Sequence, residues 1–210
     1  MLRKVKSPAV KANLPGSPIV HIDSFCVSRE GLFVDKLGNT FDCDRSLSLW
    51  TDGISSGKIV IGQSFFNLTN FSISFSIKSN SNSVIRPVIF GDRAANGFWL
   101  EVHGEMFLWR DNSGVVCNAA FDPINTIGIT RNNKTISFYK DGSTLITTQI
   151  YGDTENCTVF DMPDGCKINH MIIYARTLTD DEMMKLHNCN FQRSSGLDSL
   201  GYRNSSQSIG

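Results

Sequence analysis

The chain has 210 residues, of which 40% are hydrophobic and 19% are charged, a composition that suits one globular domain with appendages. Its twenty basic and twenty acidic residues cancel, which argues against a dedicated nucleic-acid-binding protein, because such proteins usually carry a basic excess. No apolar run approaches the length of about 18 residues that a membrane-spanning helix needs, so we expect no contact with a membrane.

The first twenty residues have the composition of an extended basic arm. Arg3, Lys4, Lys6 and Lys11 are interleaved with prolines and a glycine. The start is basic like that of a secretory signal, but the prolines interrupt any apolar stretch. We therefore expect a protein that is made in the cytoplasm and does not leave by secretion. Because such a segment cannot bury itself, we predict that its four charges anchor the domain to a larger assembly.

The six cysteines show no CxxC pair and follow no secretory signal, so we expect reduced thiols and no zinc site. They are Cys26, Cys43, Cys117, Cys157, Cys166 and Cys189.

Short strands with tight turns follow the arm. The segment GLFVDKLGNTF, ending at Phe41, predicts a β-hairpin with a turn at Gly38-Asn39. Lys58–Ile61 predicts a short strand. Further on, apolar residues alternate with serines in FSISFSIKS, which begins at Phe71. This alternation is typical of a strand with one buried face and one solvent face.

A second hairpin is predicted where Phe98–Val102 and Met106–Arg110 flank Gly104-Glu105. A two-residue turn places Leu100 opposite Trp109 on one face. On the other face it pairs Trp99 with Arg110, beside Glu101 and His103.

The stretch from Thr126 to Thr148 predicts three antiparallel strands joined by turns at Asn132-Asn133 and Asp141-Gly142. Asp-Gly is among the strongest two-residue hairpin signals. The assumed turns pair Ile129 with Ile136, Ile127 with Phe138, and Phe138 with Leu145. All five then share one buried face with Phe71, Ile73, Phe75 and Trp109.

The last predicted strand is Lys167–Tyr174, and the only convincing helix follows it. Thr179 suits the N-cap, and Glu182 three residues later completes a capping box. Leu178 and Met183 occupy the positions of a hydrophobic staple. After Asn190 the composition becomes rich in serine and glycine, which favours a tail or linker.

Three segments together resemble laminin-G-like domains of the concanavalin A-like lectin/glucanase superfamily. They are FSISFSIKS from Phe71, ISFYKDG ending at Gly142, and INHMIIYARTLTDDEMMKLHN from Ile168, and the resemblance extends over residues 32–190. It implies an all-β, two-sheet antiparallel jelly-roll sandwich with one short C-terminal helix. We therefore divide the chain into an arm at 1–20, a jelly-roll domain at 21–190 and a tail at 191–210.

The superfamily includes glucanases, whose catalytic carboxylates share one strand face. This chain has EVHGE instead, in which Glu105 falls in a predicted turn. A retaining glycosidase needs two carboxyls about 5–5.5 Å apart, and nothing in the sequence provides that pair. His21, His103, His170 and His187 are scattered, and we expect no enzymatic activity.

Laminin-G-like domains often bind Ca²⁺ at a rim of the sandwich, and the candidate ligands here are Asp92, Asp111, Asp161 and Asp164. Each aspartate also has a simpler role as a turn residue, so we assign no metal or cofactor.

Two functions remain. A glycan-binding site would use Trp99 as a stacking platform and Glu101, His103 and Arg110 as polar contacts, although Trp99 and Arg110 also suit a packed cation–π pair. The preferred hypothesis, by analogy of fold, is a non-enzymatic virion protein. Tailed phages carry such sandwiches as capsid decorations or on fibres, and here the arm would contact other virion proteins.

Overall fold

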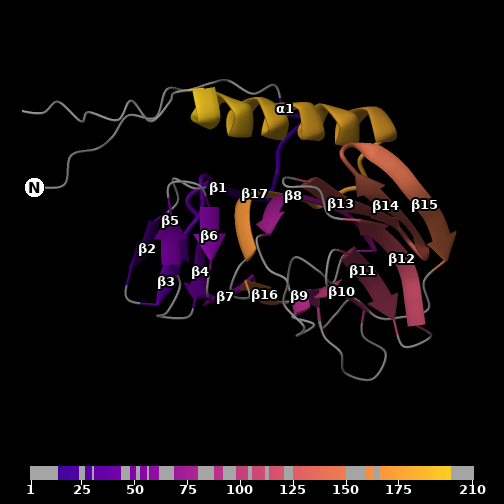
Figure 1. Ribbon diagram of the computed structural model, residues 1–210, viewed down its shortest axis with the longest axis horizontal. Helices are drawn as coiled ribbons and strands as arrows, with labels where there is room; N and C mark the ends of the chain where they lie inside the picture. The colour runs from indigo at the N-terminus through magenta and orange to yellow at the C-terminus, as the bar shows by residue number, and fades with distance from the viewer. Residues whose placement is uncertain are drawn as a thin grey trace, which may run out of the picture.

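In the part of the chain that the structure describes, the protein is a two-sheet β-sandwich with one helix packed over its upper face (Figure 1). The computed structural model describes residues 14–23, 27–29, 31–43, 48–50, 53–55, 57–61, 69–79, 88–91, 98–103, 106–111, 114–120, 125–149, 159–162 and 166–199. Within these ranges every strand pair is antiparallel, which confirms the predicted all-β sandwich. No helix among the described residues is long and apolar enough to span a membrane.

The upper sheet has eight strands. In spatial order they are β15 (Ser143–Gln149), β14 (Thr135–Lys140), β13 (Asn125–Asn132), β8 (Asn70–Ser79), β17 (Cys166–Tyr174), β6 (Gly53–Ser55) and β5 (Ser48–Trp50), with β1 (Val20–Asp23) also paired to β17. The lower sheet has nine strands. Their order is β12 (Gly114–Ala120), β11 (Met106–Asp111), β10 (Phe98–His103), β9 (Val88–Gly91), β16 (Val159–Met162), β7 (Gly57–Val60), β4 (Thr40–Cys43), β3 (Leu32–Val34) and β2 (Val27–Arg29).

The main core fills the space between the two sheets. Trp109 of the lower sheet and Phe138 of the upper sheet meet there, with ring centroids 5.4 Å apart. The predicted core residues Phe71, Ile73, Phe75, Ile127, Ile129 and Ile136 are buried with them. Leu145 is the exception: its prediction was wrong, because 43% of its surface is exposed.

The turns explain why Leu145 lies outside. Asp141 and Gly142 both have positive φ angles, 51° and 77°, as a type I′ turn requires, and Lys140 pairs with Ser143 as predicted. A β-bulge between the partners of Phe138 and Tyr139 then places Ile146, and not Leu145, opposite Phe138. A bulge adds one residue to one strand, and the turn motif alone gives no sign of it.

The preceding hairpin also differs from its predicted register. Asn132 pairs with Thr135, so the turn is Asn133-Lys134, with φ of 54° at Asn133. Ile129 therefore faces Phe138 instead of Ile136. Because strand side chains alternate with a period of two, this two-residue shift keeps every apolar side chain on its predicted face.

Helix α1 (Asp180–Ser199) covers the outer face of the eight-stranded sheet. A second hydrophobic cluster holds it there, formed by Tyr139, Ile172, Tyr174, Leu178, Met183 and Leu186, with Leu14 packed alongside. The approach is close, since a side chain at Gly128 would collide with Met183. For this reason Ser72, Ser74 and Ser76 of β8, predicted to face solvent, are buried as well.

Segments on both sides of the predicted domain boundaries belong to the fold. Leu14 is half-buried against the second cluster, and Pro15 is buried. At the other end, α1 continues to Ser199, through residues that the composition assigns to a tail. Burial raises the pKa of the Cys117 thiol to about 11.

Candidate functional site

The predicted site lies on the hairpin of β10 and β11, in the lower sheet. The structure confirms its register: Trp99 pairs with Arg110, Leu100 with Trp109, and His103 with Met106. Trp109 belongs to the main core, so the alternation of side chains places Trp99, Glu101 and Arg110 together on the outer face.

Glu101 connects the two other residues of this cluster. The indole Nε1 of Trp99 donates a hydrogen bond of 3.1 Å to Glu101 Oε2, and Nη1 of Arg110 donates one of 3.1 Å to Oε1. Only 2% of the Glu101 side chain is exposed. A carboxylate at such depth needs a paired cation and hydrogen-bond donors, and its two neighbours supply both.

Arg110 is the accessible member of the cluster, with 25% of its side chain exposed. Its Nε is buried and has no hydrogen-bond partner among the described residues. A buried donor without an acceptor is costly, and few native donors are left in this state. Nε lies below the surface, so only the exposed part of the guanidinium is accessible to a ligand.

Trp99 is less suited to the predicted role of a stacking platform. Its side chain is only 8% exposed, and its N–H is already used by Glu101. The His103 side chain lies outside the described side chains. The exposed residues near Arg110 come instead from β12, where Val115 pairs with Arg110 and Asn118 pairs with Leu108.

The other predicted site residues lie outside the described structure. They are Arg3, Lys4, Lys6 and Lys11 of the arm, and Asp92 and Asp164 of the calcium candidates. Asp111 ends β11 and Asp161 lies in β16, both without described side chains. Among the described residues no group of three or more His, Cys, Asp or Glu side chains is placed to hold a metal ion.

A histidine pair was missed by the sequence analysis. His21 of β1 and His170 of β17 are both buried, and their Nε2 atoms lie 3.0 Å apart. The rings meet edge to face with centroids 5.0 Å apart. The two residues are 149 positions apart in the chain, and no local pattern marks β1 as a partner of β17.

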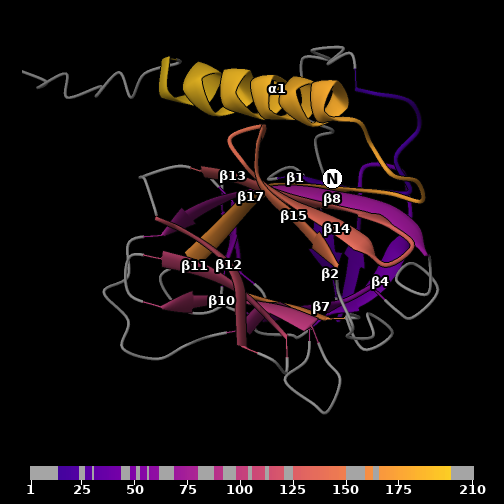
Figure 2. The same ribbon diagram turned by 90° about the vertical axis from the view of Figure 1, so that its right-hand side faces the viewer.

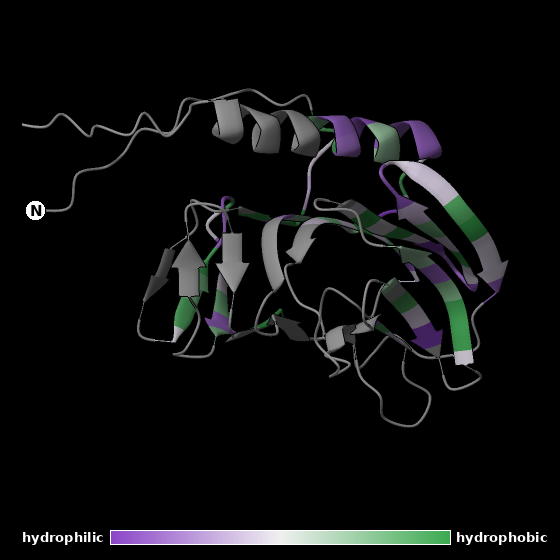
Figure 3. Ribbon diagram, in the orientation of Figure 1, coloured by the Kyte–Doolittle hydropathy of each residue, from purple (hydrophilic) through white to green (hydrophobic). Residues whose placement is uncertain are grey.

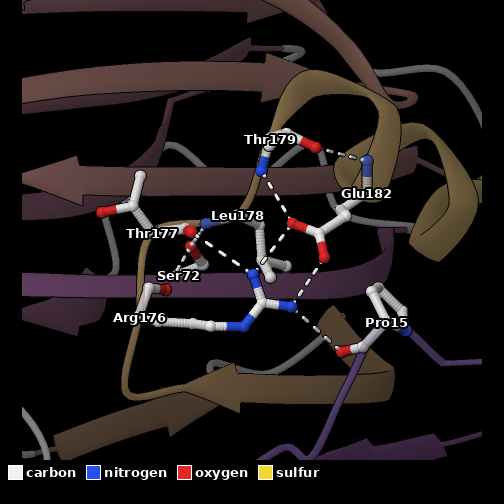
Figure 4. Close-up of polar contacts among 7 residues, drawn as sticks. All are labelled: Pro15, Ser72, Arg176, Thr177, Leu178, Thr179 and Glu182. Carbon is white, nitrogen blue, oxygen red and sulfur yellow. Dashed lines mark hydrogen bonds and ion pairs between the residues drawn. The ribbon is translucent and has the colours of Figure 1, made fainter.

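A third polar cluster fixes the start of α1 (Figure 4). Thr179 and Glu182 form the predicted capping box, with Thr179 N–H donating to Glu182 Oε2 at 3.0 Å and Glu182 N–H to Thr179 Oγ1 at 3.3 Å. Arg176 adds two hydrogen bonds to the Glu182 carboxylate, of 2.9 and 2.6 Å. These hydrogen bonds lower the pKa of Glu182 to about 2, and the bonds from Arg176 have the largest effect.

The same cluster joins the helix to β8 and to the N-terminal segment. Ser72 Oγ accepts the N–H of Leu178 at 2.8 Å and donates to the carbonyl of Arg176 at 2.9 Å. Arg176 Nη2 also donates to the Pro15 carbonyl at 3.5 Å. Every polar group named here is engaged within the fold, so we assign this cluster a structural role.

The sequence matches no family model and no curated protein. Solved structures share the fold. The ligand-binding domain of botulinum neurotoxin serotype D in complex with N-acetylneuraminic acid superposes with a TM-score of 0.61 at 17% identity, over 82% of this chain and 50% of that one. Botulinum neurotoxin type C, solved in work on its interaction with two ganglioside molecules, gives 0.61 at 18% identity, over 94% and 54%.

A mutant of Trypanosoma rangeli sialidase that displays trans-sialidase activity gives a TM-score of 0.68 at 12% identity, over 86% of this chain and 35% of that one. The fold is that of lectin-like β-sandwich domains. The chain spans about half the length of the neurotoxin domains and about a third of the sialidase, and identities this low establish the fold alone.

Proposed function

We propose that this domain is a non-enzymatic glycan-binding module and that Arg110 receives an acidic sugar on the outer face of the nine-stranded sheet. The observation that carries the proposal is the state of the Arg110 guanidinium. One nitrogen is held by Glu101, while a quarter of the Arg110 side chain is exposed. A carboxylate is the acceptor that best matches the planar guanidinium edge.

The fold supports the same class of ligand. N-acetylneuraminic acid, which is bound in the neurotoxin serotype D structure, carries a carboxylate that is ionised at neutral pH. Glu101 fixes the orientation of Arg110 in advance, which reduces the entropy lost on binding. The exposed Asn118 beside this hairpin offers a polar side chain for sugar hydroxyls.

The state of Glu101 also supports the absence of hydrolysis. Both of its carboxylate oxygens accept hydrogen bonds from Trp99 and Arg110, and the side chain is almost fully buried. A glycosidase acid or base must reach the bond being cut. The Glu101 carboxylate is instead bonded to Trp99 and Arg110 below the surface.

The test is a binding titration with sialyllactose, with lactose as the neutral comparison. Arg110→Lys keeps the positive charge beside Glu101 but loses the planar donor edge. We expect it to weaken sialyllactose binding by about tenfold or more, the range of one lost charge-assisted hydrogen bond. Arg131→Lys, on β13 of the other sheet, is the matched control and should bind like the wild type.

Two results would contradict the proposal. A wild-type protein that binds neither sugar has no glycan site of this kind. Binding that is equal in the wild type and in Arg110→Lys locates the sugar elsewhere on the molecule.

Attachment to a virion through the arm remains a second proposal, which the similar structures do not support. Its basis is still the charge pattern of Arg3, Lys4, Lys6 and Lys11. The structure sharpens the test, because Leu14 and Pro15 already pack on the domain. Deletion of residues 1–13 should therefore leave the melting temperature unchanged and abolish co-sedimentation with the particle. Undiminished co-sedimentation would end the anchoring hypothesis.

A further inference from the structure

Among the described strands, β15 forms one edge of the eight-stranded sheet, where β14 is its partner in the sheet order. Figure 2 views the molecule from this side, with β15 in front of the sheet and α1 above it. Six of its seven residues are exposed, and Thr148 is half-buried. The backbone groups of an edge strand that point away from the sheet are available to another strand.

The sequence of β15, STLITTQ, contains no charged residue and no proline. Natural proteins usually protect long edges with lysine, proline or a covering element. The bulge at Leu145 is a protective device of this kind, but it affects only the first half of the strand. From Ile146 to Gln149 the pairing with β14 is regular.

This second half is also firmly held in the sheet. Thr147 and Ser137 share a hydrogen bond of 2.7 Å between their hydroxyls, and Gln149 Nε2 donates to Thr135 Oγ1 at 3.1 Å. Ile146, with 40% of its surface exposed, accompanies Leu145 in the hydrophobic band of β15 (Figure 3). The edge is therefore a preformed template, in which β-branched residues favour strand pairing.

We propose that β15 is a self-association surface: two copies of this chain pair their β15 strands antiparallel about a two-fold axis, so that their eight-stranded sheets become continuous. A two-fold axis places the β15 strand of one copy beside the same strand of the other copy. An uncharged strand meets no like charge there, whereas like charges directly opposite would destabilise the pair. The chain as a whole carries no net charge, so two copies do not repel at long range.

The position of α1 is compatible with this arrangement. The helix lies on the outer face of the sheet and approaches β15 at the turn, where a side chain on Gly142 would lie 2.9 Å from Met184. It covers the face near the start of the strand, while Ile146 and Thr147 remain exposed. A seven-residue strand pair is at the small end of specific interfaces, so the dimer should depend on protein concentration.

Sedimentation velocity of the full chain over a wide range of concentrations tests the proposal. The wild type should shift from monomer to dimer. Ile146→Lys places an ammonium group on the β15 edge of each copy and should weaken dimerisation by about tenfold or more. Thr147→Lys changes a residue on the other face of the strand. It should also weaken dimerisation, and it leaves the face of β15 that meets the core unchanged.

Val115→Lys is the matched control, because Val115 is also exposed but lies on β12 at the edge of the other sheet. It should dimerise like the wild type. Melting temperatures of all variants verify that they fold. A wild type that stays monomeric at every concentration overturns the proposal and leaves the edge to a different partner. A dimer that persists in both Ile146→Lys and Thr147→Lys also overturns it, because association then uses another surface.

Discussion

Two arginine–glutamate pairs in this molecule have the same chemical groups but differ in how deeply the acid is buried. At the start of α1, Arg176 is 44% exposed and directs two of its nitrogens to Glu182. On the lower sheet, Arg110 gives one nitrogen to the buried Glu101 and retains a donor without an acceptor among the described residues. The first pair completes a structural motif, while the second neutralises a buried acid and leaves a quarter of the Arg110 side chain exposed.

Burial of the acid determines how much each pair contributes to the free energy of unfolding. Glu182 lies near solvent, so its pair with Arg176 is screened and contributes little. Glu101 has lost its hydration, and Arg110 must compensate for it. The predictions below test this difference, from the largest expected effect to the smallest.

The largest effect is expected from Arg110→Gln. The change leaves the Glu101 carboxylate buried without its cation, and the free energy of unfolding should fall by about 3–5 kcal/mol. Urea denaturation at neutral pH measures it, with Arg131→Gln as the control for the loss of a charge from the other sheet. A decrease below about 1 kcal/mol would mean that Glu101 is hydrated and that the two pairs are equivalent.

The next effect concerns the capping box that Arg176 supports. Thr179→Ala removes the acceptor of the Glu182 N–H and should lower the free energy of unfolding by about 1 kcal/mol. Thr40→Ala, an exposed threonine of β4, is the control and should change it by less than about 0.5 kcal/mol. Equal losses in the two variants would show that the cap does not stabilise the helix.

Low pH should remove the contribution of the Arg176–Glu182 pair to the stability of the protein. The folded-state pKa of Glu182, about 2, lies below its ordinary value of 4.5. Its contribution is therefore complete above pH 4.5 and is lost as the pH falls toward 2. The difference in stability between the wild type and Glu182→Gln should shrink over this range in thermal melts. Asp181→Asn is the neighbouring control, and a constant difference for Glu182→Gln would contradict the lowered pKa.

The smallest effect is expected from Arg176→Lys, which keeps the charge but loses the two-pronged contact with Glu182. Because the pair is exposed, the loss should be a few tenths of a kcal/mol. Chemical denaturation of the wild type and the variant in parallel measures it. A loss as large as that of Arg110→Gln would reverse the contrast between the two sites.

Local patterns predicted the local structure well. The capping box at Thr179 and the Asp141-Gly142 turn depend on residues within a few positions of each other, and both are present. The cluster of Trp99, Glu101 and Arg110 was foreseen because one hairpin contains all three residues. That Glu101 would be buried, with the indole N–H bonded to it, was not foreseen, since burial depends on distant parts of the chain.

Longer-range features could not be predicted for the same reason. A strand pattern identifies an apolar face but not its partner, so the pairing of His21 with His170 gave no signal. Ser72, Ser74 and Ser76 of β8 alternate as if they faced water, yet they are buried on the side of the sheet that carries α1. The bulge at Leu145 is a tertiary adjustment within a strand whose residues all favour regular pairing.

The position of β17 determines when this domain can fold during its synthesis. This strand is the last one among the described residues, yet it lies in the middle of the eight-stranded sheet, between β8 and β6. At usual rates of translation, β8 emerges from the ribosome several seconds before β17. During that interval the ten-residue β8, with Phe71, Ile73 and Phe75, lacks the neighbour that completes its sheet. A chain that stalls before Cys166 therefore presents a long apolar strand to other nascent chains. Synthesis of β17 in the last fifth of the sequence is needed before β8 can be paired on that side.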